Sequence, residues 1–208
     1  MIKLILKRVL WVTGLALTFP LILLTWLEAW ILGRDYERIL AWCKEILALV
    51  PTIVGEYLRL GYYSAVCRYV SPDASLLFGS MIAHRDTIIR RGVVVGVYTI
   101  IGKADIGEGV LFGARVSLLS GKYQHGRPED RIDGQVPSVQ YQVVTVGRNS
   151  WIGQGAIVMA NVGENCTVSA GAVLYKDAPD GSTFMGNPAR KANLDLGIRP
   201  SGKDGVDQ

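Results

Sequence analysis

The spacing of hydrophobic residues divides the chain into two parts. From Val9 to Leu32 the sequence is almost continuously apolar, with Pro20 near the centre and Glu28 as its one charged residue. A helix of this length, at about 1.5 Å per residue, can cross about 30 Å of hydrocarbon. Pro20 also allows a bent helix inserted from one side of a bilayer, and burial in a soluble core is a third interpretation. The pattern predicts a long apolar helix, and it favours a membrane anchor over a buried helix.

Residues 36 to 60 continue as a second helical pattern, with apolar residues at three- and four-residue steps. This spacing predicts one amphipathic helix. The side chains of Trp26, Trp30 and Trp42 suit the head-group layer of a membrane. Basic residues flank the apolar stretch on both sides: Lys3, Lys7, Arg8, Arg34 and Arg38. Their symmetry leaves the orientation in a membrane undecided, and we expect residues 1–70 to form a helical membrane-anchoring segment.

From about Ser71 the hydrophobic period changes to six residues. An aliphatic or aromatic residue followed by a small one recurs in Val95-Gly96, Ile101-Gly102, Ile106-Gly107, Phe112-Gly113, Val146-Gly147, Ile152-Gly153, Val158-Met159, Val162-Gly163 and Val168-Ser169. A period of six fits neither an α-helix nor continuous strand alternation. It predicts a solenoid of triangular coils, in which each hexapeptide forms one flat face and its aliphatic residue points into a shared core.

Charge and cysteine content exclude several classes of function. The formal net charge is +4, and no run of basic residues with interleaved aromatics is present, so we expect no nucleic-acid partner. The three cysteines form no CxxC motif and no cluster with histidine, so we expect no metal site. Unpaired cysteines also favour a reducing, cytosol-facing environment.

The hexapeptide pattern resembles that of the hexapeptide-repeat acyltransferases, over roughly Ser71 to Lys191. The resemblance implies a mainly β fold: a left-handed parallel β-helix over residues 71–191, preceded by the helical membrane-associated segment. A flexible tail over 192–208 would follow. Within this family the chain is similar to the sugar O-acetyltransferases, such as the maltose and galactoside enzymes. That likeness implies acetyl-CoA as the acyl donor.

A break in the repeat over residues 120–142 carries the first candidate site. It is polar and contains His125, one of two histidines in the chain. In the sugar acetyltransferases a loop between coils holds the catalytic histidine, and His125 matches it. An imidazole that titrates near neutrality is a suitable general base for an alcohol. The carboxylate that orients this base is left open among Asp86, Asp105, Glu129 and Asp130.

The same loop supplies candidate acceptor-binding residues. Tyr123 and Arg127 are polar side chains close to His125 in sequence, and His84 lies on an earlier coil. For His84, a subunit interface or the capping of a corner is an equally open interpretation.

The second candidate site is the C-terminal run from Val146 to Lys191. By resemblance, its residues match a coenzyme A-binding surface: Trp151 at the thioester end, Gln154 and Ala170 at the pantetheine amides, Tyr175 and Lys176 near the adenine and phosphates, and Arg190 at the phosphates. Arginine is a multidentate phosphate donor, which agrees with the last assignment. The step from Val158 to Val162 is two residues shorter than the corner typical of maltose-type enzymes, which predicts a tighter turn at Ala160-Asn161.

Together these features predict an O-acetyltransferase that acts on a membrane-associated glycan, an exopolysaccharide precursor or another lipid-linked saccharide. The resemblance implies a homotrimer with sites between subunits, and the apolar segment points to membrane lipid at the cytoplasmic face of a bacterial inner membrane. Two alternatives stay open: a non-catalytic β-helical scaffold, and an acetyltransferase for another small acceptor. A γ-class carbonic anhydrase would need three histidine ligands, and the chain has two.

Overall fold

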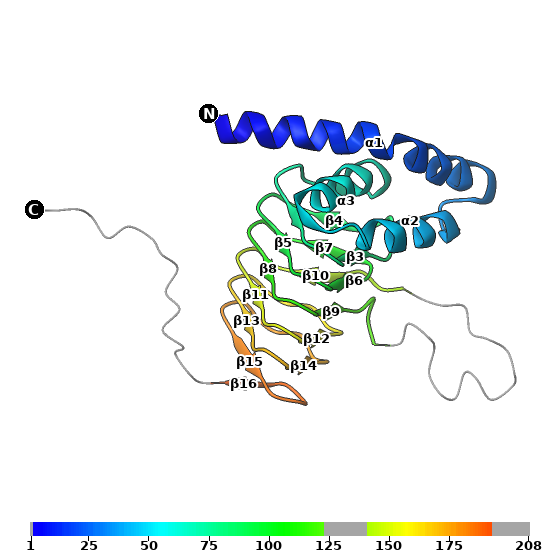
Figure 1. Cartoon of the computed structure of the whole chain (residues 1–208). Coiled ribbons are helices and arrows are strands. Elements are labelled where there is room, and N and C mark those ends of the chain that lie inside the picture. The colour runs from blue at the N-terminus through cyan, green and yellow to red at the C-terminus, as the bar shows by residue number, and fades with distance from the viewer. Residues whose placement is uncertain (1, 123–140, 193–208) are drawn as a thin grey trace, which may run out of the picture.

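A computed structural model describes residues 2–122 and 141–192 of the chain. Its elements are a cap of three helices followed by a stack of short strands (Figure 1). The helices are α1 (Ile2–Leu32), α2 (Arg38–Ala48) and α3 (Thr52–Val66). α1 confirms the predicted apolar helix, and within the described residues it is the helix long and apolar enough to cross a membrane by length and composition.

The strands form three parallel sheets, one on each face of the coils. Sheet A holds β1 (Tyr69–Val70), β4 (Ile88–Ile89), β7 (Ala104–Ile106) and β10 (Val144–Val146). Sheet B holds β2 (Ser75–Leu76), β5 (Val94–Val95), β8 (Leu111–Phe112), β11 (Trp151–Ile152), β13 (Thr167–Val168) and β15 (Thr183–Met185). Sheet C holds β3 (Met81–Ile82), β6 (Ile100–Ile101), β9 (Ser117–Leu118), β12 (Ile157–Val158) and β14 (Val173–Leu174).

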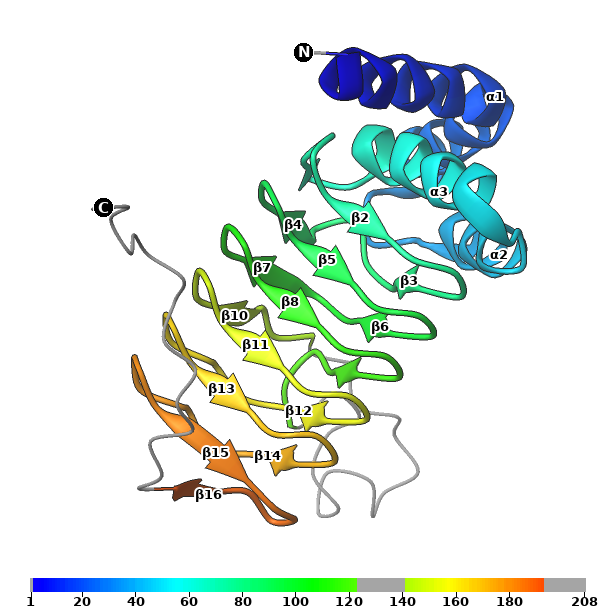
Figure 2. The same ribbon diagram turned by 60° about the vertical axis from the view of Figure 1, so that its left-hand side comes forward.

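The chain visits the sheets in the order A, B, C and then returns to A one coil further on, as Figure 2 shows. About five such turns stack into the predicted β-helix, and its left-handed sense stays a prediction. The last strand, β16 (Arg190–Ala192), pairs antiparallel with β15 and ends the solenoid. The first strand begins at Tyr69, two residues before the expected boundary of the solenoid.

The residues at the six-residue positions point into the solenoid core, each at most 8% exposed: Val70, Leu76, Ile82, Ile89, Val95, Ile101, Ile106, Phe112, Leu118, Val146, Ile152, Val158, Val162, Val168, Leu174, Ala178 and Phe184. The small residues that follow allow the coils to stack closely. A Cβ at Gly153, for example, would lie 2.4 Å from the backbone nitrogen of Ala170 on the next coil. The six-residue period therefore corresponds to the length of one face of a coil.

All irregular steps of this pattern fall at one corner of the triangle, where sheet C leads to sheet A. Every step from sheet A to B and from B to C is six residues. From C to A the step is seven residues from Ile82 to Ile89, five from Ile101 to Ile106 and four from Val158 to Val162. The segment between β9 and β10 leaves from the same corner. We call this corner the CA edge; among the described residues it comprises 83–87, 102–103, 119–122, 141–143, 159–161 and 175–177.

The helical cap differs from the expectation of one helix over residues 36 to 60. The chain turns at Leu49–Pro51, and α3 starts after it. Proline has no N–H and its ring clashes with the carbonyl four residues back, so a continuous helix ends there. The carbonyl oxygens of Leu47 and Val50 accept hydrogen bonds from the buried Arg59 guanidinium, at 2.8 and 2.9 Å. Arg59 thereby closes the end of α2.

The cap covers the first coil of the solenoid. The Tyr63 hydroxyl on α3 accepts a hydrogen bond from the Ile82 backbone nitrogen at 3.1 Å. Arg59 Nε donates to the Leu76 carbonyl oxygen at 3.1 Å. α3 therefore satisfies backbone groups that no preceding coil is present to satisfy among the described residues, and α1 lies outside α3 (Figures 1 and 2).

Candidate functional site

The loop over residues 120–142 is anchored at the CA edge by its two ends. The Gln142 backbone nitrogen donates to the Ser120 carbonyl oxygen at 3.0 Å, and the Ser120 hydroxyl accepts from the Lys103 backbone nitrogen at 2.8 Å. Gly121 has φ +88 and faces the Gln142 side chain, which leaves no room for a Cβ. Three candidate residues of this loop, Tyr123, His125 and Arg127, lie outside the described residues.

A groove of about 270 Å³ opens beside the base of this loop. Lys122 and Gln142 line it from the loop ends, and Met159, Asn161 and Asp177 line it from the next two coils. The short corner predicted at Ala160-Asn161 forms its floor, where the Asn161 backbone nitrogen donates to Asp177 Oδ1 at 2.9 Å. A polar groove therefore lies directly next to the segment that contains His125.

Three cationic side chains gather around Tyr175 near this groove. Arg190 Nη1 donates a hydrogen bond to the Tyr175 hydroxyl at 2.9 Å. Lys122 Nζ and Lys176 Nζ lie 5.8 and 5.7 Å from the centre of the Tyr175 ring. These cations lower the pKa of the Tyr175 hydroxyl, with the Arg190 hydrogen bond as the largest cause. Three of the residues predicted to meet adenine and phosphates are thus brought together, and Lys122 joins them.

The other three predicted cofactor residues lie on a different part of the solenoid. Trp151 is on β11 of sheet B, is 41% exposed, and stands between Leu111 and Thr167 in the sheet register. Gln154 and Ala170 follow at the corner between sheets B and C, where the Gly171 backbone nitrogen donates to the Gln154 carbonyl oxygen at 2.8 Å. Sheet C separates this corner from the Tyr175 cluster at the CA edge.

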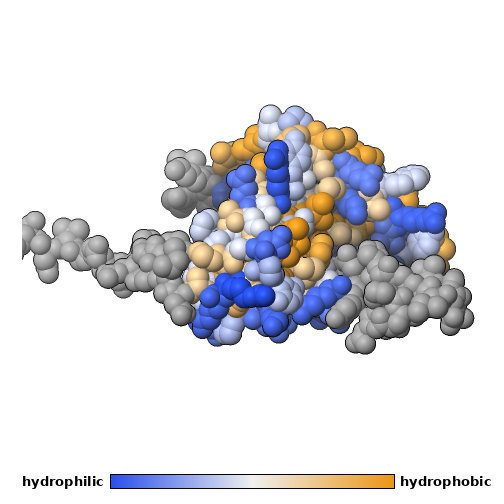
Figure 3. All heavy atoms as spheres, turned by 90° about the horizontal axis from the view of Figure 1, so that it is seen from below, coloured by the Kyte–Doolittle hydropathy of each residue, from blue (hydrophilic) through white to orange (hydrophobic). Residues whose placement is uncertain are grey.

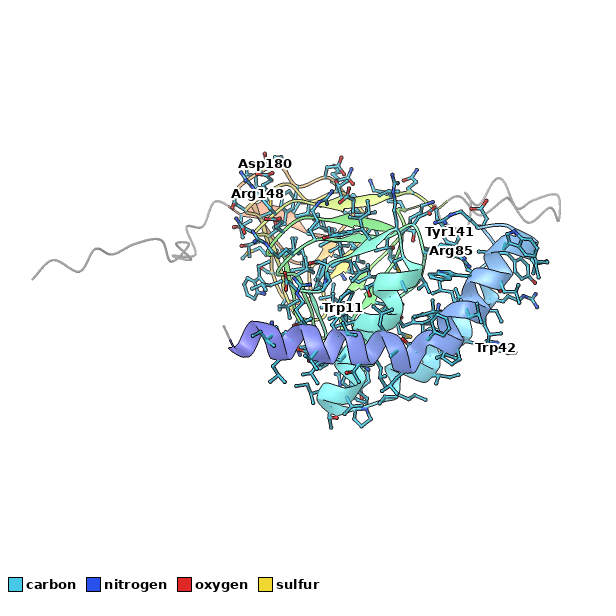
Figure 4. The ribbon with its side chains drawn as sticks, turned by 90° about the horizontal axis from the view of Figure 1, so that it is seen from above. Trp11, Trp42, Arg85, Tyr141, Arg148 and Asp180 are labelled. Carbon is cyan, nitrogen blue, oxygen red and sulfur yellow. The ribbon has the colours of Figure 1, made fainter. Side chains whose placement is uncertain are left out.

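His84 lies on the CA edge but at the opposite end of the solenoid. Its Nδ1 is 2.7 Å from Glu37 Oε2, and its ring lies against Tyr141, with 4.0 Å between ring centroids. His84 belongs to the first coil and Tyr175 to the fifth, and four coil spacings separate them by roughly 19 Å. These contacts join the cap to a corner of the first coil, and contact of His84 with the acyl acceptor stays a prediction. Figure 4 shows the neighbouring Arg85 beside Tyr141.

Two of the carboxylates considered as partners of His125 are engaged elsewhere. Asp86 is 3.0 Å from Lys103 Nζ, and this hydrogen bond is the main cause that lowers the pKa of Asp86. Asp105 forms an ion pair with Arg90 on sheet A. Glu129 and Asp130 lie outside the described residues. The two that can be placed are held by cations, so neither is preferred as the orienting group.

A larger groove of about 530 Å³ lies along sheet A and the corner that follows it, and acidic side chains outnumber basic ones in its lining: Asp105, Glu108, Glu164 and Asp180 against Arg90 and Arg148. Arg90 pairs with Asp105, and Arg148 Nε is 2.8 Å from Glu164 Oε2. In Figure 4, Arg148 lies on the side of the solenoid away from Tyr141. An anionic ligand meets more unbalanced positive charge at Tyr175, so the smaller groove is the better candidate site.

Lys122 was not singled out from the sequence. It follows Gly121 at the start of an irregular segment, and a single lysine in such a position is typical of a surface loop. Only the stacking of coils brings it to Tyr175, whose own position is 53 residues further along the chain.

Comparisons with known proteins agree with this architecture. No protein-family model matches the chain. Nodulation protein L of Rhizobium leguminosarum bv. viciae is 38% identical over 87 residues, which are 41% of this chain and 44% of that protein. Galactoside O-acetyltransferase of Lactococcus lactis subsp. lactis is 30% identical over 138 residues, 60% of each protein. The aligned segments span between 26% and 60% of the length of the curated relatives.

Among solved structures, a maltose O-acetyltransferase from Clostridium difficile 630 has the same fold. It superimposes with a TM-score of 0.53 and 21% sequence identity, over 76% of this chain and 84% of that one. The coil geometry and these comparisons lead to one conclusion: the solenoid of this chain is similar to those of acetyltransferases built from hexapeptide repeats.

Proposed function

We propose that this protein is an O-acetyltransferase that moves an acetyl group from acetyl-CoA to a sugar hydroxyl of a membrane-associated glycan or exopolysaccharide precursor. The observation that carries the proposal is the cation cluster of Lys122, Lys176 and Arg190 around Tyr175. It lies at the base of the loop that contains His125, on a solenoid related to sugar acetyltransferases.

The residues of the cluster fit the anionic half of coenzyme A. Its 3′-phosphate and diphosphate need several cationic donors, and arginine and lysine supply them at one edge here. Tyr175 adds an aromatic face next to these charges. In this proposal Lys122, Lys176 and Arg190 hold the phosphates, and Trp151, Gln154 and Ala170 contact the pantetheine arm.

The reaction needs one general base. The hydroxyl proton of the sugar passes to the His125 imidazole as the hydroxyl oxygen bonds to the acetyl carbonyl carbon. The carbon–sulfur bond breaks, and the coenzyme A thiolate takes the proton back from His125. The products are an acetyl ester and the free thiol. The enzyme forms no covalent bond, which agrees with the burial of Cys43, Cys67 and Cys166.

A homotrimer would complete this site. Trp151 and Gln154 lie on sheet B and the corner after it, whereas the Tyr175 cluster lies at the CA edge of the same chain. A single ligand that touches both groups must either cross sheet C or lie between two copies of the chain. The second arrangement agrees with a site between subunits. For the acceptor and location, we propose a lipid-linked saccharide at the cytoplasmic face of a bacterial inner membrane.

The proposal is tested with the full chain purified in detergent. Acetyl-CoA consumption is measured with membrane glycan as acceptor, for the wild type and for His125→Ala. Loss of the base lowers turnover by at least about a hundredfold. Coenzyme A binding by His125→Ala, measured by calorimetry, is expected to equal that of the wild type and serves as the folding control.

Two results would contradict the proposal. Undiminished turnover in His125→Ala, with coenzyme A binding intact, would exclude His125 as the base. A wild-type protein that binds no coenzyme A would instead favour a β-helical scaffold without catalysis.

A further inference from the structure

The outward face of α1 has the polarity expected for contact with hydrocarbon. Its exposed large side chains from Val9 onward are apolar and at least 47% exposed: Val9, Val12, Leu17, Phe19, Leu23, Leu24, Trp26, Leu27, Trp30, Ile31 and Leu32. The fully buried positions of the same helix are Gly14, Thr18, Ile22, Thr25 and Glu28. A surface helix of a water-soluble domain has the opposite arrangement, with its apolar stripe inward. From Val9 onward, α1 therefore has most of its large apolar side chains outward and most of its polar side chains inward.

The threonine and glutamate side chains of α1 have hydrogen-bond partners within the protein. Thr13, Thr18 and Thr25 donate to carbonyl oxygens one turn earlier, at 2.8 to 2.9 Å. Glu28 is buried, accepts from the Ile39 backbone nitrogen at 2.7 Å, and pairs with Arg85 at 3.2 Å. An apolar medium penalises unpaired polar groups by several kcal/mol, so this arrangement suits a lipid-facing helix.

The same helix is attached lengthwise to the cap. A Cβ at Gly14 would lie 2.1 Å from the Tyr57 carbonyl oxygen, which shows how closely α1 meets α3. Trp11 Nε1 donates to the Ser64 hydroxyl at 3.0 Å, and Thr25 shares a hydrogen bond with the Tyr62 hydroxyl at 2.8 Å. If α1 crossed a bilayer, α3 and the first coil of the solenoid would have to enter the hydrocarbon with it. The contacts exclude that arrangement for this fold.

We propose that α1 lies in the plane of a lipid bilayer, with its outward face inserted into one leaflet and the solenoid projecting away from the membrane. Exposed apolar residues of α2, α3 and the turn between them, Trp42, Ile46, Leu49, Ile53 and Val54, extend the inserted surface. Figure 3, viewed from the end of the solenoid opposite the cap, shows hydrophobic residues as a rim beyond the coils.

Basic side chains stand at both ends of the apolar face. Arg8 precedes it and Arg34 follows it, with 46% and 66% of their side chains exposed. Each forms a long ion pair with an aspartate, Arg8 with Asp73 at 3.5 Å and Arg34 with Asp86 at 3.7 Å. At these positions they can meet lipid phosphates while the stretch between them is in hydrocarbon. This charge arrangement favours a bilayer over a second copy of the chain, whose own arginines would face the same positions.

Vesicle flotation of the full chain tests this inference, with phosphatidylcholine vesicles with and without phosphatidylglycerol. The wild type is expected to float with both, and more strongly with the anionic lipid. Leu23→Lys/Leu27→Lys should bind at least roughly a hundredfold more weakly, because each change removes an inserted apolar side chain and puts a charge in its place. Leu111→Lys is the matched control, since Leu111 on sheet B is 46% exposed and Leu27 is 47% exposed. It should float like the wild type.

A depth measurement separates lying in the plane from spanning. A nitroxide on a cysteine at Val12 or Leu23 can be placed selectively, because the native cysteines are buried. The two positions are about 17 Å apart along the helix. An in-plane helix gives both probes the same shallow depth, and a spanning helix gives depths that differ by most of that distance.

Three outcomes would overturn the inference: a wild type that stays with the soluble fraction, probes at clearly different depths, or a lipid-free dimer that Leu23→Lys/Leu27→Lys converts to monomer without any vesicle binding. None of these readouts depends on acetyl transfer. Failure of membrane insertion is therefore distinguishable from failure of the proposed enzymatic function.

Discussion

At the scale of single residues, the cluster around Tyr175 is assembled from three distant segments. Lys122 comes from the loop, Tyr175 and Lys176 from the fifth coil, and Arg190 from the terminal hairpin. Because each cation acts on the same ring and on the same expected phosphates, their contributions are coupled. Arg190 has the shortest contact and is the residue most informative to change.

Arg190→Gln is expected to weaken coenzyme A binding by about tenfold, since a charged hydrogen bond contributes about 1.5–3 kcal/mol. It should also raise the pKa of Tyr175, because Arg190 is the main cause that lowers it. Calorimetry gives the first effect, and ultraviolet titration of tyrosine gives the second. Comparison with dephospho-coenzyme A identifies the phosphate involved. An unchanged affinity together with a raised tyrosine pKa would place the cofactor elsewhere.

At the scale of elements, α3 connects α1 to the first coil of the solenoid. Its Tyr62 hydroxyl meets Thr25 of α1, and its Tyr63 hydroxyl meets the Ile82 backbone of the first coil. Both rings are fully buried, and their ring centroids are 5.4 Å apart. Burial raises the pKa of both hydroxyls well above the ordinary value of 10.0. α3 is therefore the element whose packing is most sensitive to alkaline pH.

The direction of this pH dependence follows from the pH at which each tyrosine ionises in the folded and in the unfolded chain. Above about pH 10 the unfolded chain ionises both tyrosines and the folded chain keeps them protonated. Each tyrosine therefore lowers the free energy of unfolding by about 1.4 kcal/mol per pH unit as pH rises through this range. Burial raises the pKa of the Cys67 thiol as well, so three groups contribute to the slope. Chemical denaturation of the wild type and of Tyr62→Phe at several alkaline pH values measures this. Tyr62→Phe should lose about a third of the slope, and an unchanged slope would contradict the assignment.

At the scale of the whole molecule, cap and solenoid form one folded unit. Arg59 reaches from α3 to the carbonyl oxygens of Leu47, Val50 and Leu76, and the Gly79 backbone nitrogen donates to the Ala48 carbonyl oxygen at 3.2 Å. The first coil buries its apolar side chains beneath these helices. Repeat proteins need such a terminal cap, since each coil is otherwise stabilised only by its neighbours.

A chain that starts at Arg68 is therefore expected to fold poorly, although the repeat begins one residue later. Without the cap, water reaches the sides of Leu76 and Ile82 that the helices cover. It also reaches the backbone groups of the first coil that lose their partners. We expect a thermal unfolding temperature at least about 10 °C lower and a tendency to aggregate. Circular dichroism and light scattering, against the full chain in the same detergent, measure both. A monodisperse fragment with unchanged stability would show that residues 71–191 form an independent domain.

The sequence by itself determined the parts of this protein that depend on local periodicity. Steps of six residues, with glycine after many of the core positions, specify a β-helix, because a solenoid buries every sixth residue and brings backbones as close as Gly153 and Ala170. The apolar stretch likewise predicts the long helix α1. The place of Lys122 beside Tyr175 was not predictable in this way, since it depends on which segments become neighbours. The turn at Pro51 has a local cause, the missing N–H and the ring of proline, which the apolar spacing over residues 36 to 60 does not register.

Only the tertiary structure decided how these parts relate to one another. Apolar composition shows that α1 prefers hydrocarbon, but the inward contacts of Gly14 and Glu28 show which face is left for it. The same holds for the irregular steps, which are scattered along the chain and meet at a single edge only after the coils stack. Periodicity acts within a few residues, whereas the candidate site and the proposed membrane-facing surface arise from contacts between residues tens of positions apart.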